Sequence, residues 1–254
     1  MRPIEEQGYV IVAVNSDAVD YVACARQLSQ SLKSHVPDAR VCLITDQVIE
    51  DIWFDHVRVL PVVLDNPYAN DAQIFKLSPF RETIKLEADM LIASDISHWW
   101  TMFRHRDVVI STGCRNWRGD VSTARNYRKV FDLNHLPDVY NAVTYWRLSE
   151  TAKDFFGLVR DIFVNWEHYQ QVIKFAPEQP DTDLVYAMAA QIMGPEQVTI
   201  PFATYPKIVH MKRHHAGTDT EDWTQQLVWE TDPLRIQTIA QHGAFHYNRK
   251  TWRV

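Results

Sequence analysis

Short, continuously apolar runs alternate with amphipathic stretches along the first part of the chain. The first run, Tyr9 to Val14, is rich in valine, breaks at Asn15-Ser16-Asp17 and leads into an amphipathic stretch that reaches Val36. Such a run is typical of a strand buried on both faces, and the spacing after it predicts a helix. Similar strands are expected at Arg40 to Thr45 and at His56 to Val63. Buried strands that alternate with helices predict an α/β fold with a mostly parallel central sheet flanked by helices.

The rest of the chain continues this pattern without an internal repeat or a low-complexity linker. Strands are expected at Asp107 to Thr112 and at Tyr140 to Trp146, and a helix capped by Ser149 follows. Pro177 and Pro180 end that helix, and Asp181-Thr182-Asp183 opens the next one. With 254 residues, 46% of them hydrophobic, the chain is long enough to bury a substantial core. We expect a single domain over residues 1–254, in which residues 214–254 form a C-terminal extension.

Composition narrows the class of protein further. The N-terminal segment carries Glu5 and Glu6 where a signal peptide would be basic, and no stretch approaches the roughly 18 apolar residues of a membrane-spanning helix. Cys24, Cys42 and Cys114 are widely spaced, as expected for buried thiols in a reducing compartment. These features favour a soluble protein of the cytoplasm, or of a host's cytoplasm if the chain is viral, with no membrane partner.

Two acids interrupt an otherwise apolar strand-like segment, Thr83 to Ile92. Burying unpaired carboxylates is costly, so Glu87 and Asp89 are expected at a strand end, against a cation, a donor or water. Side chains alternate along an extended chain, so these two residues should point to the same side. The pair can therefore share one metal ion.

The segment KLSPFRETIKLEADMLIASDI, residues 76–96, resembles the GT-A glycosyltransferases, and within them the retaining enzymes of family 8. The resemblance covers most of residues 8–213 and matches Glu-Ala-Asp to the family's DxD-type motif, with glutamate in place of the first aspartate. It implies a GT-A fold and a nucleotide diphosphate sugar, most simply a uridine diphosphate (UDP) sugar, as donor. It also implies a metal, Mn²⁺ or Mg²⁺, held by Glu87, Asp89 and the histidine of Ile208-Val209-His210-Met211-Lys212.

The same resemblance assigns further residues to the donor. The leaving diphosphate carries negative charge that a metal and nearby cations neutralise, and Lys76, Arg81 and Lys212 are the candidate cations. Positions that hold the nucleoside in the family correspond to Asn15, Asp17 and Asp46, whose alternative role is turn formation.

Catalytic residues are implied at the start of a helix. Asp181-Thr182-Asp183 matches a family Asp-Gln-Asp pattern that faces the sugar and acceptor, with threonine replacing the amide. Asp181 and Asp183 are therefore candidate catalytic residues, and capping of the helix is the competing use of Asp181. Retention of the anomeric configuration follows from the resemblance alone, and a donor phosphate oxygen would then help to take the acceptor proton.

A basic and aromatic stretch, residues 115–129, suggests the acceptor. Although the net charge of the chain is -6, this stretch carries five basic residues against one acid, with two aromatic rings between them. Such a surface grips phosphates and stacks a base. The phrase LEADMLIASDISHWW also resembles glycosyltransferases of tailed bacteriophages that modify hydroxymethylated pyrimidines in their own DNA. We favour double-stranded DNA with such bases as acceptor, bound by Arg115, Trp117, Arg118, Arg125, Arg128 and Asn141.

Three alternatives stay open. The basic stretch is also compatible with a solvated face, in which case the acceptor would be a saccharide, a lipid-linked sugar or a protein hydroxyl. A sugar nucleotidyltransferase also uses acids and a metal, but it needs a Gly-rich phosphate loop, and VNSDAVDYV contains no glycine. A non-catalytic sugar-binding protein is the third alternative.

Overall fold

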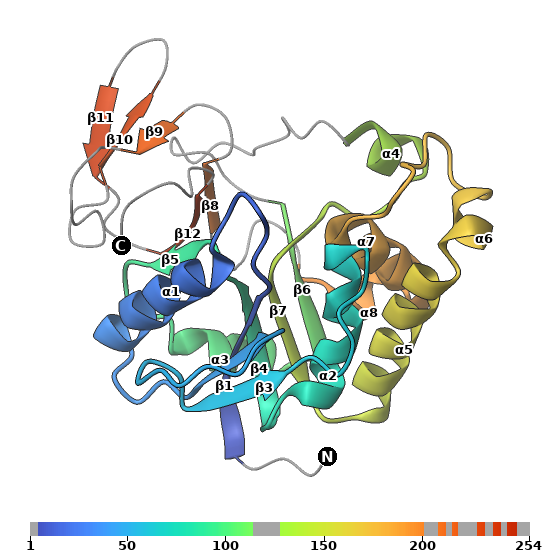
Figure 1. The fold of residues 1–254 in the computed structure, drawn as a ribbon. Helices are drawn as coiled ribbons and strands as arrows, with labels where there is room; N and C mark the ends of the chain where they lie inside the picture. The colour runs from blue at the N-terminus through green and yellow to red at the C-terminus, as the bar shows by residue number, and fades with distance from the viewer. Residues whose placement is uncertain are drawn as a thin grey trace.

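The computed structural model describes residues 5–113 and 128–200, together with the short segments 208–211, 215–217, 228–231, 236–239 and 243–247. A central six-stranded sheet has helices packed on both of its faces (Figure 1). Its strand order is β3-β2-β1-β4-β7-β6. The bounds are β1 Glu5–Ala13, β2 Val41–Thr45, β3 His56–Val59, β4 Phe80–Glu87, β6 Val108–Thr112 and β7 Val139–Arg147.

The sheet is mostly parallel, as predicted. Parallel pairs join β1 to β2, β2 to β3 and β1 to β4, whereas β7 runs antiparallel to both β4 and β6. The predicted strand at His56 to Val63 ends early, at Val59, because Pro61 follows closely and has no N–H to donate to a ladder. β3 is an edge strand and only partly buried. The other early strands are buried on both faces.

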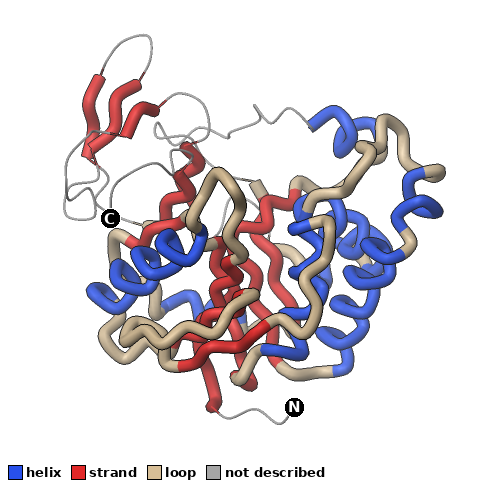
Figure 2. Tube along the Cα trace, in the orientation of Figure 1, coloured by secondary structure: helices blue, strands red, loops and turns tan. Residues whose placement is uncertain are grey.

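Helices cover the sheet in two groups (Figure 2). α1 (Tyr21–His35) and α3 (His98–Phe103) pack on one face, where they bury Tyr9 and Ile11 of β1. On the other face, Val10 packs with α5 (Glu150–Val164) and α7 (Thr182–Met193). Side chains on the two faces of β1 thus pack into two separate hydrophobic cores. Shorter elements are η1 Pro67–Gln73, α2 Ile74–Leu77, α4 Arg128–Leu133, α6 Trp166–Gln170 and α8 Pro195–Val198.

The predicted helix starts are confirmed by their caps. Ser149 Oγ accepts a hydrogen bond from Ala152 N at 3.1 Å at the start of α5. Asp181 Oδ1 accepts one from Leu184 N at 2.8 Å at the start of α7. Each side chain satisfies a backbone donor that has no partner within the helix. In the described part of the chain, the helices are all too short or too polar to cross a membrane.

The two acids lie at a strand end, as predicted, but the extended chain assumed through both Glu87 and Asp89 is wrong. β4 ends at Glu87, Ala88 and Asp89 form a turn, and β5 (Met90–Ile92) starts a different sheet. The order of that sheet is β5-β12-β8, with β8 at Ile208–Met211 and β12 at Ala244–Tyr247. The turn allows the chain to leave the central sheet after β4 and to enter the second sheet as β5. A third sheet contains β9 (His215–Gly217), β10 (Val228–Thr231) and β11 (Ile236–Ile239).

The second sheet carries the end of the chain back to the acidic pair. β12 lies in the predicted C-terminal extension, yet it pairs with β5 directly after the acidic turn, so that His246 is the register partner of Met90. On its other side β12 runs parallel to β8, and His246 is there the register partner of His210. His246 is thus held on the strand next to β5, close to the turn that contains Asp89, and His210 lies one strand farther away.

Candidate metal centre

Three side chains from two distant parts of the sequence meet at the carboxyl end of β4. Glu87, Asp89 and His246 each offer one ligand atom, and these atoms all lie within 4.8 Å of one another. His246 Nε2 lies 2.9 Å from Asp89 Oδ1 and 3.4 Å from Glu87 Oε2. The imidazole and Asp89 are buried, and Glu87 is partly buried. The prediction that the two acids act together agrees with this geometry, but a turn rather than strand alternation brings them together.

The donor set fits a divalent cation. Two carboxylate oxygens and one imidazole nitrogen suit Mn²⁺ or Mg²⁺, and the nitrogen favours Mn²⁺. Burial raises the pKa of the Glu87 carboxyl, while the positive charges of His246 and Lys85 oppose that rise. A carboxylate in this position is costly to keep ionised without a cation nearby. A bound metal would remove that cost.

Both ring nitrogens of His246 have partners. Nε2 faces the two carboxylates, and Nδ1 is hydrogen-bonded to the hydroxyl of Tyr140 on β7. The Tyr140 side chain is also buried, with its ring centroid 5.7 Å from that of the imidazole. The orientation of the imidazole is therefore fixed from two sides.

A buried ionic network lies directly behind the acids. Lys85, two residues before Glu87 on β4, is 3% exposed, and its Nζ lies 2.9 Å from Asp71 Oδ2 on η1. The ammonium also donates to the carbonyl of Asn141 at 3.2 Å. Burial alone lowers the pKa of Lys85, but the carboxylates of Asp71, Glu87 and Asp183 outweigh that effect and raise it. A permanent positive charge thus stands beside the candidate metal ligands, where it lowers the cost of keeping several acids close together.

The two candidate catalytic aspartates occupy different environments. Asp183 is buried, accepts a hydrogen bond from the backbone N–H of Asn141 at 2.7 Å and lies within electrostatic reach of Glu87 and Lys85. Asp181 caps α7 through Leu184 N, the alternative weighed from the sequence. Asp183 therefore lies close enough to act electrostatically on Glu87, whereas the Asp181 side chain is used to cap the start of α7.

Asn141, a candidate acceptor residue, is fully buried. Its side chain donates to Asp71 Oδ2 at 3.2 Å and accepts a hydrogen bond from the Thr144 hydroxyl. β7 lies between β4 and β6 in the sheet, which explains the burial. Asn141 therefore links the sheet to the Lys85 network.

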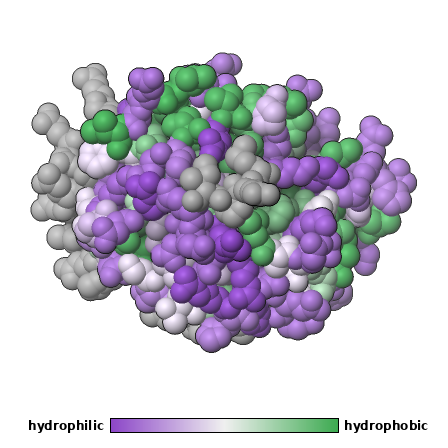
Figure 3. All heavy atoms as spheres, turned by 90° about the horizontal axis from the view of Figure 1, so that it is seen from below, coloured by the Kyte–Doolittle hydropathy of each residue, from purple (hydrophilic) through white to green (hydrophobic). Residues whose placement is uncertain are grey.

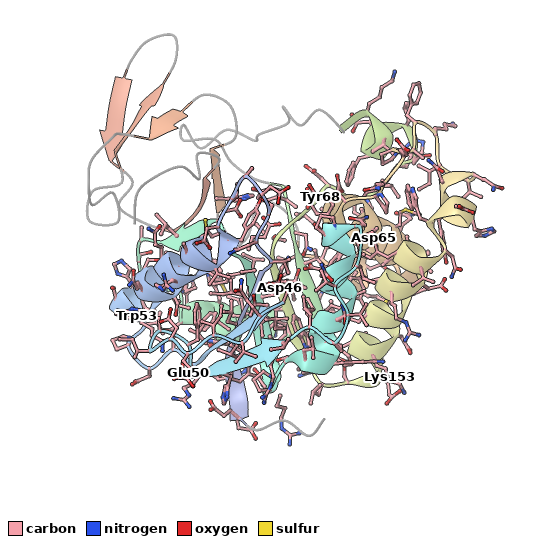
Figure 4. The ribbon with its side chains drawn as sticks, in the orientation of Figure 1. Asp46, Glu50, Trp53, Asp65, Tyr68 and Lys153 are labelled. Carbon is pink, nitrogen blue, oxygen red and sulfur yellow. The ribbon has the colours of Figure 1, made fainter. Side chains whose placement is uncertain are left out.

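Candidate nucleoside residues lie where the sequence predicted them, beyond the carboxyl ends of the neighbouring strands β1 and β2. Asn15 Oδ1 accepts a hydrogen bond from Val22 N at 3.0 Å, which holds the loop that leads into α1. Asp17 is exposed, and Asp46 is exposed directly after β2. Figure 4 labels Asp46 near the middle of the molecule, with Asp65 and Tyr68 of the η1 region nearer the upper edge.

Two of the candidate phosphate-binding cations are not brought to the acidic pair. Arg81 stands at the start of β4, six residues and therefore roughly 20 Å along the strand from Glu87, and it pairs with Glu6. Lys76 is exposed on α2, which precedes that same end of β4. The sequence placed them near the motif, but an extended strand separates them from it. The lower face of the molecule, toward which these strand starts point, is largely hydrophilic (Figure 3).

Several predicted residues cannot be placed in this way. Arg115, Trp117, Arg118, Arg125 and Lys212 lie outside the described residues, and Arg128 opens α4 without a described side chain. His210 is placed by its backbone alone, as the register partner of His246.

His246 is the candidate metal ligand that sequence reasoning missed. Its signal resembles the one used for His210: a histidine in a short apolar segment, Ala244-Phe245-His246-Tyr247, with Arg249 and Lys250 close behind. Lys85 was missed as well. A lysine inside an otherwise apolar strand segment indicates a buried cation that needs an acidic partner.

No protein-family model matches this sequence, and no curated protein matches it either. Solved structures do match. Mouse xyloside xylosyltransferase 1 in its apo form is 12% identical, with a TM-score of 0.58 over 98% of this chain and 99% of that one. The galactosyltransferase LgtC, in complex with donor and acceptor sugar analogues, is 12% identical, with a TM-score of 0.55 over 94% of this chain and 86% of that one. The fold is that of the GT-A glycosyltransferases. The fold predicted for this chain is thereby confirmed, and in this GT-A fold the three metal-ligand candidates stand at the carboxyl end of central strand β4.

Proposed function

We propose that this chain is a metal-dependent glycosyltransferase that moves a sugar from a nucleotide diphosphate sugar, in the first place a UDP sugar, to an acceptor hydroxyl. The observation that carries the proposal is the meeting of Glu87, Asp89 and His246 within 4.8 Å. The GT-A fold of the chain supports it. As in the family 8 enzymes that the motif resembles, the reaction would retain the anomeric configuration; an inverted product would contradict that part.

Each group has a distinct task in this proposal. Glu87, Asp89 and His246 hold Mn²⁺ or Mg²⁺, which when bound would neutralise charge on the departing diphosphate. Asp183 faces the sugar, oriented by the backbone N–H of Asn141. Lys85 keeps the surrounding acids close together at low electrostatic cost. Asn15, Asp17 and Asp46 hold the nucleoside at the sheet edge, Lys212 assists at the phosphates, and Asp181 orders the start of α7.

We propose DNA that contains 5-hydroxymethylated pyrimidines as the acceptor, which would make the protein a bacteriophage DNA-modifying enzyme of the host cytoplasm. The support is the basic and aromatic stretch around Arg115, Trp117 and Arg125. A base hydroxyl in duplex DNA is reached in the major groove or by flipping the base out, and both routes need a phosphate-binding surface. A saccharide, lipid-linked sugar or protein hydroxyl is the alternative acceptor.

Mass spectrometry of DNA tests this proposal. Duplexes with and without hydroxymethylated pyrimidines are incubated with a panel of UDP sugars and Mn²⁺. We expect a mass gain of one sugar residue on the hydroxymethylated duplex only, lost with a chelator and weakened strongly by salt because phosphate contacts dominate the affinity. Transfer to saccharide acceptors without any transfer to DNA would overturn the choice of acceptor. No metal-dependent transfer or hydrolysis of any donor would overturn the enzymatic function.

A further inference from the structure

Tyr140 contacts the one nitrogen of His246 that a metal would not use. Nε2 faces Asp89 Oδ1 at 2.9 Å and Glu87 Oε2 at 3.4 Å, so this nitrogen is on the metal side. Nδ1, on the far side of the ring, is hydrogen-bonded to the Tyr140 hydroxyl. Since Tyr140 is 2% exposed and His246 4%, water competes little for either group.

The backbone around Tyr140 is held firmly. The Ser111 hydroxyl on β6 donates to the carbonyl of Tyr140, and the N–H of the next residue, Asn141, donates to Asp183 Oδ1 at 2.7 Å. The phenol ring lies at 39° to the imidazole, with centroids 5.7 Å apart. Tyr140 thus reaches His246 from a fixed strand of the central sheet, whereas His246 comes from near the end of the chain.

The position of one proton decides what this contact does. A neutral imidazole carries its proton on one nitrogen and a lone pair on the other. Without a metal, a proton on Nε2 is well placed to be donated to Asp89, and Nδ1 then accepts from the Tyr140 hydroxyl. A metal needs the lone pair on Nε2, so the proton must be on Nδ1 and be donated to the Tyr140 oxygen. A tyrosine hydroxyl serves in both arrangements because it is both a donor and an acceptor.

We propose that Tyr140 is a positioning residue for the metal: it fixes the imidazole ring and changes from hydrogen-bond donor to acceptor when the cation binds. The proton count of the pair is unchanged, because the Nε2 proton is lost and one is gained at Nδ1. This inference rests on the proposed metal site and adds a residue to it. The Tyr140 hydroxyl contacts Nδ1, the ring nitrogen opposite the one that faces the carboxylates, so it acts on the metal site through His246.

Tyr140→Phe is the variant that tests this role, because it removes one oxygen and keeps the ring. Tyr145→Phe is the matched control: Tyr145 is another fully buried tyrosine of β7, and its ring packs on Trp100 and Phe103. Mn²⁺ affinity is measured from the electron paramagnetic resonance signal of free Mn²⁺, with the metal alone and again with UDP. We expect Tyr140→Phe to weaken Mn²⁺ binding about tenfold, in the range for partners of metal-ligating histidines. Tyr145→Phe should bind as the unaltered protein does.

Equal Mn²⁺ affinity in the Tyr140→Phe variant and the unaltered protein would overturn the role of Tyr140 and leave the metal site standing. Absence of Mn²⁺ binding to the unaltered protein would overturn both. If Tyr140→Phe does not fold, ¹⁵N NMR of histidine side chains in the unaltered protein decides, with His246→Gln used for assignment. Saturation with Mg²⁺ should move the proton of His246 from Nε2 to Nδ1. A proton that stays on Nε2 would contradict the proposal.

Discussion

Replacing Asp89 with asparagine should lower the rate of sugar transfer about 1,000-fold, the upper range for losing one electrostatic contribution to a transition state. Asparagine keeps the size of the side chain and removes the charge that a cation requires. Asp89 Oδ1 is the carboxylate oxygen closest to His246 Nε2, at 2.9 Å, so the substitution removes a negative charge directly beside the imidazole. The measurement is kcat for transfer at saturating Mn²⁺ and donor.

Asp154→Asn supplies the control for this experiment. Asp154 is exposed on α5, so the same chemical change is made away from the acidic pair. Thermal unfolding of both variants should stay close to that of the unaltered protein. A folded Asp89→Asn variant with undiminished transfer would refute the assignment of Asp89 as a ligand.

Alanine at position 246 should reduce transfer about 100-fold and weaken Mn²⁺ binding, because the only nitrogen in the described ligand group is then lost. Alanine at position 210 is a closely matched control, since His210 is the register partner of His246 on the adjacent parallel strand. The backbones of paired strands lie only about 4.8 Å apart, so both substitutions act in one small region. Both variants are assayed for transfer and for Mn²⁺ affinity.

The two histidines give separable outcomes. A loss confined to His246→Ala identifies His246 as the ligand that the resemblance had assigned to His210. A loss confined to His210→Ala would restore the original assignment and contradict the site proposed from the structure. Comparable losses in both would mean that each imidazole contributes.

Much of the fold could be predicted because its signals are local. The Tyr9 to Val14 run indicated a strand buried on both faces, and its alternating side chains do pack into two different cores. The acids in an apolar segment also indicated a site, since buried carboxylates need a partner. The turn at Ala88 could not be predicted from alternation, because it depends on β5 leaving the central sheet for a partner near the end of the chain.

Residues that depend on long-range pairing were missed or assigned to the wrong surroundings. His246 reaches the acids through the pairing of β12 with β5, for which the sequence offers only a short apolar segment near its end. Asn141 was expected to face an acceptor, but the central position of β7 buries it. Arg81 is only six residues from Glu87 in the sequence, but β4 is extended, so the two residues lie near opposite ends of the strand. The sequence therefore predicted the types of residue at the site better than it predicted which residues lie next to one another in the fold.

The Lys85–Asp71 pair explains how so many acids can share one region. Removing one member of a buried ion pair costs about 3–5 kcal/mol, because the other charge is left uncompensated. Here the Lys85 ammonium compensates Asp71 at 2.9 Å and also acts on Glu87 and Asp183. The central sheet thus carries a fixed internal counterion, and the candidate metal site is built beside it.

Anomalous diffraction from a crystal grown with Mn²⁺ and UDP tests the central claim most directly. We expect one strong manganese peak among Glu87 Oε2, Asp89 Oδ1 and His246 Nε2, in contact with the diphosphate. A manganese peak elsewhere in the protein, or UDP bound with no peak among these three atoms, would contradict the account.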